Sequence, residues 1–252
     1  MTALVTGASG GLGAAVALAL ADAGHDVAVH YRGDEAGARD VAAAVAARGR
    51  RASTLQADLD VPLDTPQALD AACAGLLDRC ADDLGTPDVV VLSAFPQHQQ
   101  GWSDLDAAAW DGYHRAGLRP TAVLLRQATD RMGPGGAAVV VGSIEGLRAA
   151  PGHAAYAVAK AALHHLVAAA AHEVGPRGVR VVGVAPGLVD REGLEDAWPD
   201  GVARYRATAS LGRPVTAAEV AGTVAFLASP VASGITGTTV TIDAGWSAAP
   251  GW

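Results

Sequence analysis

Three residues of this chain combine chemical types and a spacing that suit proton transfer: Ser143, Tyr156 and Lys160. Tyr156 and Lys160 stand four positions apart in an alanine-rich run, so a helix would place the phenol and the ammonium on one face. A nearby cation favours the phenolate, so we expect Lys160 to lower the pKa of Tyr156 and make its hydroxyl a proton donor near neutral pH. Such a pair also occurs by chance on many helices, so its interpretation depends on the surrounding elements.

Ser143 follows the apolar run 137–142, which is typical of a buried strand. In open α/β sheets, ligands bind beyond the carboxyl ends of the strands. A serine at the end of a strand, with a helix carrying Tyr156 and Lys160 beside it, would therefore contribute to one ligand site.

The amino-terminal stretch has the organisation of a phosphate-binding turn. Residues 3–6 form an expected strand, 7–13 a glycine-rich turn that opens a helix through residue 23, and 27–31 the next strand. Glycines let the backbone approach a pyrophosphate closely, and the helix directs its N–H groups and positive dipole end at it. Because the turn lies between a strand and a helix, we predict a dinucleotide site here.

Strands and helices alternate along the rest of the chain, with a loop rich in charge and proline expected from 187 to 214. The continuous apolar strands indicate a sheet covered on both faces. The sequence therefore predicts one α/β domain over 1–252, a Rossmann-type doubly wound parallel sheet with helices on both faces. We expect further strands over 52–57, 89–92, 137–142, 179–184 and 238–242, and helices over 35–47, 66–84, 105–132, the segment around Tyr156 and 217–228.

Composition restricts the classes of partner. The chain has 252 residues, half of them hydrophobic, with a formal net charge of −8 and a pI near 5.4. This argues against nucleic-acid and anionic-membrane partners, because phosphate backbones require a basic surface. Cys73 and Cys80 lack metal-ligand spacing and are expected to be reduced helix residues, and no metal site is predicted. No signal peptide is expected, and the apolar run 161–171 is too short to span a bilayer, so we expect a cytoplasmic protein.

Taken in order, these motifs resemble the short-chain dehydrogenase/reductase family along essentially the whole chain. The turn from Thr6 to Gly13 is similar to that family's cofactor loop, and Ser143, Tyr156 and Lys160 are similar to its catalytic core. The carboxyl-terminal part also fits, because the family's post-strand turn and closing segments are matched by 186–187, 211–214, 219–221, 226–229 and 235–245.

The resemblance implies hydride transfer between a nicotinamide cofactor and a ketone or alcohol. Tyr156 would donate or accept the proton at the substrate oxygen, Ser143 would hydrogen-bond that oxygen, and Lys160 would bind the nicotinamide ribose. Hydride delivery builds negative charge on the oxygen, which such donors stabilise. Besides Tyr156 and Lys160, the resemblance places the cofactor against Thr6, Gly7, Ser9, Gly11, Leu12, Gly13, Tyr31, Arg32, Asp58, Leu59, Ser93, Pro186, Gly187 and Val189.

NADP(H) is favoured over NAD(H) as the cofactor. An enzyme that prefers NAD usually carries an acid at the end of the second strand, whereas this chain has Tyr31 followed by Arg32. An arginine at this position can pair bidentately with a 2′-phosphate. The alternative interpretation is a solvated arginine beside Asp34 and Glu35, whose charges would oppose a phosphate.

Two positions depart from the family pattern. After the fourth expected strand the family usually carries Asn-Asn-Ala-Gly, and this chain has Leu-Ser-Ala-Phe at 92–95. Aligning Trp110 with the family's tryptophan puts Gly117 where an asparagine normally holds a water for proton relay to the lysine. A water held by backbone groups, or His114 one turn earlier, could take over this relay.

These departures leave alternatives to a ketone or alcohol reductase. A pteridine-type C=N reductase is one, because the strand end 30–32 is similar to that of pteridine reductases. A dinucleotide-binding regulatory or scaffold protein with little turnover is the other. We expect a small-molecule substrate chosen by the loops near 94–104 and 187–214. Glu145 and His153 are candidate rim residues, and Arg191 in the second loop could favour an acidic substrate. By resemblance, the chain forms a homotetramer or a homodimer.

Overall fold

The apolar runs form one parallel sheet in the computed structural model, which describes residues 1–249. Seven strands lie in the order β3-β2-β1-β4-β5-β6-β7. This order reverses between β1 and β4, and such a switch point opens a ligand crevice beyond the carboxyl ends of the strands. The strands are β1 (Thr2–Val5), β2 (Asp26–Tyr31), β3 (Ala52–Gln56), β4 (Val89–Leu92), β5 (Ala137–Val141), β6 (Arg180–Pro186) and β7 (Thr239–Ile242).

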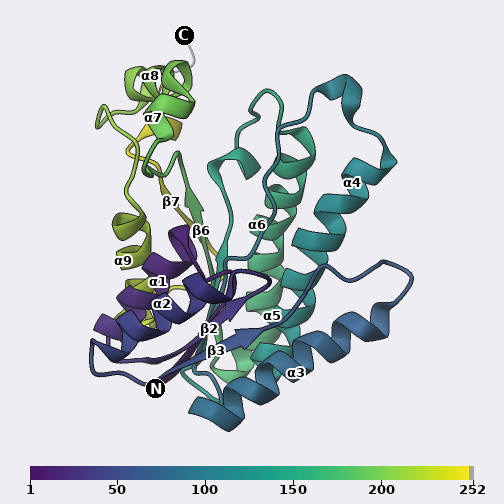
Figure 1. Cartoon of the computed structure of the whole chain (residues 1–252), viewed down its shortest axis with the longest axis vertical. Helices are drawn as coiled ribbons and strands as arrows, with labels where there is room; N and C mark the ends of the chain where they lie inside the picture. Colours follow the sequence, from purple (N-terminus) through teal and green to yellow (C-terminus); the bar gives the residue numbers. More distant parts are fainter. Residues whose placement is uncertain (250–252) are drawn as a thin grey trace.

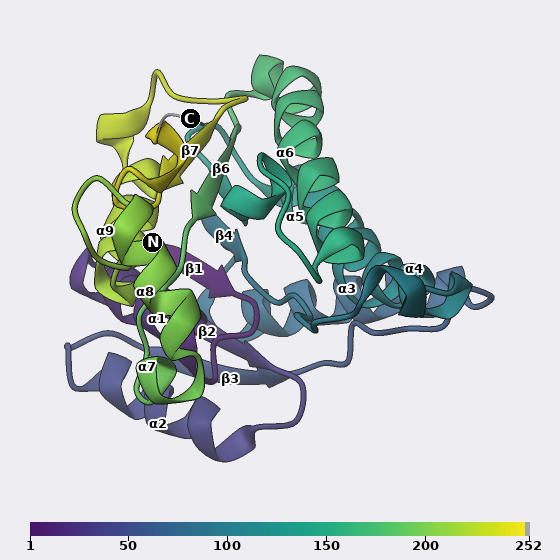
Figure 2. The same cartoon turned by 90° about the horizontal axis from the view of Figure 1, so that it is seen from above.

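Helices cover both faces of the sheet (Figures 1 and 2), which confirms the predicted Rossmann-type α/β fold. Successive strand residues point to opposite faces, so Leu4 joins one core while Ala3 and Val5 join the other. One core is shared with α3 (Pro66–Leu84), α5 (Arg119–Arg131) and α6 (Ala154–Val174), and the other with α1 (Gly11–Asp22), α2 (Glu35–Ala46) and α9 (Ala217–Ala228).

The segment expected as one helix over 105–132 is divided into three parts. α4 (Ala107–Tyr113) leads into the π-helical turn η2 (His114–Leu118), and α5 continues from Arg119. Pro120 has no N–H group to donate back along the helix, which helps to explain the wider turn that precedes it. Gly117 is the buried residue of this turn.

The prediction of an irregular loop over 187–214 was wrong, because this segment contains α7 (Leu194–Ala197) and α8 (Pro199–Thr208). Pro199 and Asp200 occupy the first turn of α8, where proline and acidic residues favour a helix start. Val202 and Tyr205 bury the inner face of α8. Both helices lie at one end of the molecule, away from α3 (Figure 1).

α6 is longer than the apolar run 161–171 suggested. Together with the turn that follows it, Ala154–Arg177 is long and apolar enough, by length and composition only, to cross a membrane. The expectation that no such span exists was therefore wrong in its length argument. Leu163, Val167 and Val174 are buried in the main core, so we interpret α6 as a core helix of the sheet.

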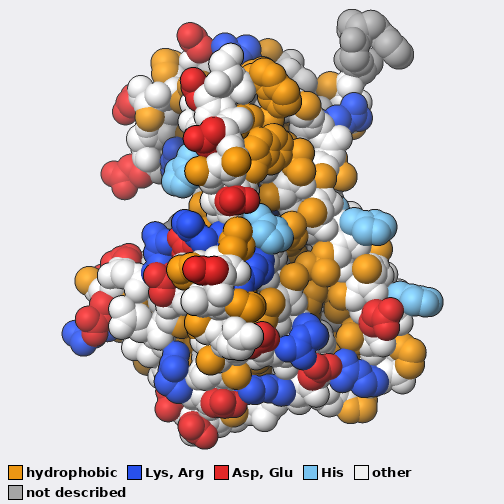
Figure 3. Space-filling view, turned by 90° about the vertical axis from the view of Figure 1, so that its right-hand side faces the viewer, with side chains coloured by type: hydrophobic (Ala, Val, Ile, Leu, Met, Phe, Trp, Pro, Cys, Tyr) orange, Lys and Arg blue, Asp and Glu red, His pale blue; other side chains and the backbone are white. Residues whose placement is uncertain are grey.

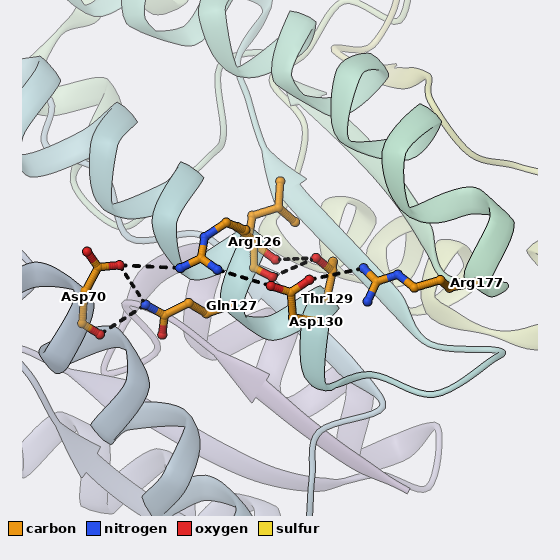
Figure 4. A network of polar contacts seen from close by, with 7 residues as sticks. Asp70, Arg126, Gln127, Thr129, Asp130 and Arg177 are labelled. Carbon is orange, nitrogen blue, oxygen red and sulfur yellow. Dashed lines mark hydrogen bonds and ion pairs between the residues drawn. The ribbon is translucent and has the colours of Figure 1, made fainter.

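The outer surfaces of the helices carry charges of both signs. Basic and acidic side chains are interspersed on the face shown in Figure 3. A polar network joins α3 and α5 (Figure 4), where Gln127 donates to the carboxylate of Asp70 at 3.1 Å and Arg126 lies 3.5 Å from it. These exposed ion pairs add little stability each. On the inner side of α3, Cys73 and Cys80 are buried free thiols, as predicted.

Candidate active site

The end of β5 and the start of α6 bring Ser143, Tyr156 and Lys160 together. Ser143 caps the short helix η3 (Ile144–Gly146), and its Oγ accepts a hydrogen bond from the Glu145 N–H at 3.1 Å. α6 begins at Ala154, so Tyr156 and Lys160 lie in its first two turns, as their spacing predicts. All three side chains are buried, and Lys160 is only 3% exposed.

Lys160 is the only lysine of the chain. Its Nζ donates to the carbonyl oxygen of Val141 at 2.8 Å and lies 3.8 Å from the ring centroid of Phe95. Burial lowers the pKa of Lys160 to about 7, because removal from water penalises the ammonium. The amine therefore titrates near neutral pH.

Tyr156 differs electrostatically from the expectation of a lowered pKa. Burial raises the pKa of Tyr156 to about 12, and a hydrogen bond with Ser143 offsets only part of this rise. The charge of Glu145 raises it further. The amine of Lys160 lies 5.5 Å from the centroid of the tyrosine ring, but desolvation is the largest cause of the shift, so the pKa of Tyr156 rises.

The glycine turn between β1 and α1 has the geometry of an anion cradle. A Cβ on Gly13 would lie 2.1 Å from the Gly7 carbonyl oxygen, so this position admits only glycine. Gly10 and Gly11 face open space, and no side chain caps the amino end of α1. The first N–H groups of the helix are therefore available to an anion. Ser9 belongs to the same turn, and Leu12 lies in the first turn of α1.

Thr6 ties this turn to the end of β4. Its Oγ1 accepts hydrogen bonds from the N–H groups of Ser93 at 2.9 Å and Ala94 at 3.1 Å. A Cβ on Gly7 would meet Ala94 at about 3 Å, and Gly7 has a φ of 63°. Thr6, Gly7 and Ser93 thus hold the two loops at the switch point of the sheet.

His30 is a positioning residue that sequence reasoning missed. Its Nδ1 accepts the Gly7 N–H at 3.1 Å, and its Nε2 lies 3.1 Å from the Ala57 carbonyl oxygen. Burial lowers the pKa of His30 to about 4, so the imidazole is neutral and donates through Nε2. The signal in the sequence is a histidine inside the otherwise apolar strand 27–31.

A cavity of about 890 Å³ lies beside the glycine turn and is lined by five of the predicted cofactor-binding residues, Tyr31, Arg32, Asp58, Leu59 and Ser93. The side chain of Arg32 is 67% exposed, with Nη1 3.9 Å from Asp60. Asp60 also pairs with Arg115 of η2, and the cavity is lined by these two arginines together with Asp34, Asp58 and Asp60.

Pro186, Gly187 and Val189 also lie at the carboxyl edge of the sheet, at the end of β6 rather than beside the glycine turn. Pro186 ends β6, and the Gly187 N–H donates to Ile242 at 2.9 Å. Val189 pairs with Val215 as an isolated bridge. These residues do not line the large cavity. They lie at and just after the end of β6, which is the neighbour of β5, the strand that leads to Ser143.

The two departures from the family pattern meet in space. A Cβ on Gly117 would lie 2.5 Å from Cζ of Phe95. The Phe95 ring also contacts Tyr113 and Tyr156, with ring centroids 6.5 and 5.8 Å apart. His114, the alternative relay residue, is exposed on η2.

Of the candidate rim residues, Glu145 and His153 form a pair near Tyr156. Nδ1 of His153 lies 2.7 Å from Oε2 of Glu145, and the His153 ring is 5.9 Å from the Tyr156 ring. Arg191 is exposed in the segment before α7. Glu145 and His153 therefore border the tyrosine directly.

Known proteins share this architecture and this arrangement of motifs. A family model described as Enoyl-(Acyl carrier protein) reductase matches residues 7–247. The cis-4-hydroxycyclohexanecarboxylate dehydrogenase of Sinomonas cyclohexanicum is 34% identical over 250 residues, which cover 98% of this chain and 96% of the relative. The 3-oxoacyl-(acyl-carrier-protein) reductase FabG of Staphylococcus aureus is 32% identical over 253 residues, with 97% of each chain covered.

A solved structure gives the same result. A short chain dehydrogenase from Burkholderia cenocepacia, in complex with NADP, superposes with a TM-score of 0.87 at 33% identity, covering 98% of this chain and 97% of the other. The sheet order and the glycine turn define a dinucleotide-binding α/β protein. The matches show, more specifically, that the chain belongs to the short-chain dehydrogenase/reductase family of oxidoreductases, which confirms the resemblance.

The residues present fit a nicotinamide dinucleotide. The uncapped amino end of α1 and the open space at Gly10 and Gly11 suit a pyrophosphate, and the adjoining cavity suits a nucleoside. The buried, bonded amine of Lys160 suits a ribose hydroxyl as a hydrogen-bond donor.

Proposed function

We propose that this chain is an NADP(H)-preferring reductase or dehydrogenase that interconverts a ketone and an alcohol. The observation that carries the proposal is the convergence of Ser143, Tyr156 and Lys160 beside an anion cradle at the switch point of the sheet. A merely structural core would not require a serine, a tyrosine and a buried amine at one strand end.

Each of the three residues has a distinct role. The nicotinamide supplies the hydride when it is bound. Tyr156 donates its phenolic proton to the oxygen that becomes the alcohol, and Ser143 donates a hydrogen bond to the same oxygen. Lys160 holds the cofactor ribose, and its charged form favours the phenolate that Tyr156 becomes. In the reverse direction the phenolate accepts the proton.

We assign the parts of the cofactor to different positions along the carboxyl edge of the sheet. Thr6, Gly7, Ser9, Gly11, Leu12 and Gly13 hold the pyrophosphate, and Asp58 and Leu59 line the adenine end beside Tyr31. Ser93, Pro186, Gly187 and Val189 flank the nicotinamide end. These assignments rest on the position of each residue at the carboxyl edge.

The preference for NADP(H) rests on Arg32. Its exposed guanidinium stands at the cavity with a distant contact to Asp60 at 3.9 Å, so it is free to turn toward a 2′-phosphate. Arg115 neutralises Asp60 from the other side and thereby reduces the opposing charge. The related Burkholderia structure contains NADP, which supports this choice.

The substrate is a small carbonyl compound or alcohol. One relative is named for a cyclic hydroxy acid and another for an oxoacyl group, which supports this class. We place substrate selection in the segments 94–104 and 187–214. The chain works in the cytoplasm as a homodimer or homotetramer, and the half-exposed Val158 on α6 offers a contact for such assembly.

The first test is a tryptophan-fluorescence titration of the purified chain, which has five tryptophans, with NADPH and separately with NADH. Tighter binding of NADPH supports the proposal, and tighter binding of NADH contradicts the cofactor preference. Binding of neither cofactor contradicts the enzyme proposal.

A panel of ketones, quinones and pterins, followed by loss of NADPH absorbance, then tests the reaction class. Turnover of ketones supports the proposal. Turnover confined to pterins would favour the C=N reductase alternative, and cofactor binding without turnover of any compound would favour the scaffold.

A further inference from the structure

Phe95 lies between Lys160 and Gly117. Its ring centroid is 3.8 Å from Nζ of Lys160, and the ring meets Tyr156 edge-on at an interplanar angle of 82°. Among residues 1–249, the hydrogen-bond partner of the ammonium is the Val141 carbonyl oxygen. The aromatic face therefore covers a side of the ammonium that no other described polar group contacts.

Gly117 is what admits the ring. A Cβ at this position would lie 2.5 and 2.6 Å from two ring carbons of Phe95, which is closer than real Cβ contacts. Any larger residue at 117 would displace the ring. The family pattern has glycine where this chain has Phe95, and asparagine where it has Gly117. The bulky and the small residue have thus exchanged places.

We propose that Phe95 positions Lys160 by placing the face of its ring against the ammonium. The ring has room there because residue 117 is a glycine. The ring takes the place of the water that an asparagine holds in the family pattern. This inference rests on the proposed function of Lys160 in holding the cofactor and assisting Tyr156.

The energetic argument depends on the burial of Lys160. A cation above an aromatic face gains most when both groups are desolvated, and Lys160 is 3% exposed. Burial alone disfavours the charged amine, and the ring partly compensates. The ring thus supports the charged form that the proposed reaction requires, at the site where a relay water would otherwise hydrate it.

The titratable groups near this amine or near its aromatic neighbours come from three elements. Tyr156 and His164 lie on α6, Tyr113 on α4, and Glu145 on η3 beside Tyr156. Burial, with a smaller contribution from the charge of Lys160, lowers the pKa of His164. No carboxylate of the described residues is bonded to Lys160, so the Val141 carbonyl and the Phe95 ring are its favourable contacts.

The single lysine makes a direct experiment possible. Protein labelled with ¹³C and ¹⁵N in lysine gives one set of lysine side-chain signals, all from Lys160. In the parent we expect the protons next to Nζ to be shifted upfield by the ring current. Phe95→Leu keeps the site apolar and removes the ring, so the upfield shift should disappear. The pKa of Lys160 should also fall by about half a unit or more.

Phe226→Leu is the matched control, because Phe226 is the other phenylalanine of the chain and is 46% exposed on α9. It should leave the Lys160 signal and its titration as in the parent. A Phe95→Leu variant that titrates like the parent and keeps the upfield shift would overturn the proposal.

Gly117→Ala tests the second half of the pair. It should move the ring and change the Lys160 signal in the same direction as Phe95→Leu. In the Phe95→Leu background it should add little, because the clashing ring carbons are gone. Additive changes would overturn the coupling of the two positions. If Gly117→Ala alone does not fold, the double variant still gives this comparison against Phe95→Leu.

The lysine titration needs neither substrate nor cofactor, so it can succeed where the proposed function fails. For an active enzyme, the pH above which kcat/KM declines should follow the Lys160 pKa and move down in Phe95→Leu but not in Phe226→Leu. A packing residue with no electrostatic effect would lower stability without moving this pH.

Discussion

The two sides of the candidate site hold charge by different means. On the side of β1, β2 and α1, the backbone provides the contacts: helix N–H groups point into an open turn, and His30 fixes the turn through the Gly7 N–H. On the side of β4, η2 and α6, side chains fill the space. There Phe95, Tyr113 and Tyr156 form an aromatic cluster around the amine of Lys160.

The difference shows which features of a site can be exchanged. At Gly13 the neighbour is the backbone oxygen of Gly7, which no substitution can remove. At Gly117 the neighbour is the side chain of Phe95, which a second substitution can remove. Backbone contacts therefore keep the family pattern, whereas side-chain contacts can be rebuilt in pairs.

The largest effect is expected from Tyr156→Phe, on the side of the site that is filled by side chains. Loss of the proton donor should reduce kcat by about 10³-fold, whereas NADPH affinity should stay near that of the parent. Tyr205→Phe is the control, because Tyr205 is also buried and its hydroxyl donates to the backbone carbonyl oxygen of Asp243 at 2.7 Å. Steady-state kinetics and fluorescence titration measure both quantities, and unchanged kcat in Tyr156→Phe would contradict the mechanism.

On the backbone half, Gly13→Ala should destabilise the fold by about 3 kcal/mol and weaken cofactor binding, because its Cβ would collide with the Gly7 carbonyl. Gly222→Ala in α9 is the matched helical control, since a Cβ there meets nothing within 4 Å. Urea unfolding monitored by circular dichroism measures the difference. Equal stability of the two variants would mean that the turn is less rigid than its geometry indicates.

The titration of His30, which fixes the glycine turn, predicts that the stability of the fold depends on pH. Its folded pKa of about 4 is below its ordinary value of 6.5, so the unfolded state binds more protons between these values. Stability is complete above pH 6.5 and falls as the pH decreases toward 4. Between pH 7 and pH 5 the loss from this group is roughly 2 kcal/mol.

The His30 dependence is checked by urea unfolding at several pH values. His30→Asn retains an acceptor for the Gly7 N–H and cannot titrate, so its stability should change less over this range. His165→Asn, at an exposed position on α6, should behave like the parent. A parent whose loss matches that of His30→Asn would exclude His30 as the source.

The smallest effect concerns Arg32, where we expect Arg32→Ala to weaken NADPH binding about tenfold and to leave NADH binding nearly unchanged. NADH lacks the 2′-phosphate with which the exposed guanidinium of Arg32 is proposed to pair. Arg39→Ala on α2, which loses an exposed pair with Glu35, serves as the control. A similar loss for both cofactors in Arg32→Ala would contradict the phosphate contact.

Much of the fold followed from the sequence because its strands are continuous apolar runs bounded by glycine and helix signals. β4 and α3 have the bounds expected for them. α8 was missed, because its few buried positions, among them Val202 and Tyr205, give a weak apolar pattern amid charged residues. The π-helical turn at 114–118 was also missed, since hydrophobic spacing does not reveal one extra residue in a turn.

The site was less predictable where it depends on desolvation. The spacing of Tyr156 and Lys160 correctly predicted a shared helix face, but it did not reveal that burial would raise the tyrosine pKa. Likewise, Phe95 and Gly117 were visible as separate departures 22 positions apart. Only the three-dimensional structure shows that one fills the space left by the other.

The single lysine also allows local unfolding around α6 to be detected by proteolysis. A lysine-specific protease has one peptide bond to cut, between Lys160 and Ala161, at the end of the second turn of a helix that is packed on the sheet. In the native state this bond is protected, so cleavage follows the excursions in which α6 detaches. The rate at which the two fragments appear would therefore report the opening of the core, and a bound cofactor should lower this cleavage rate.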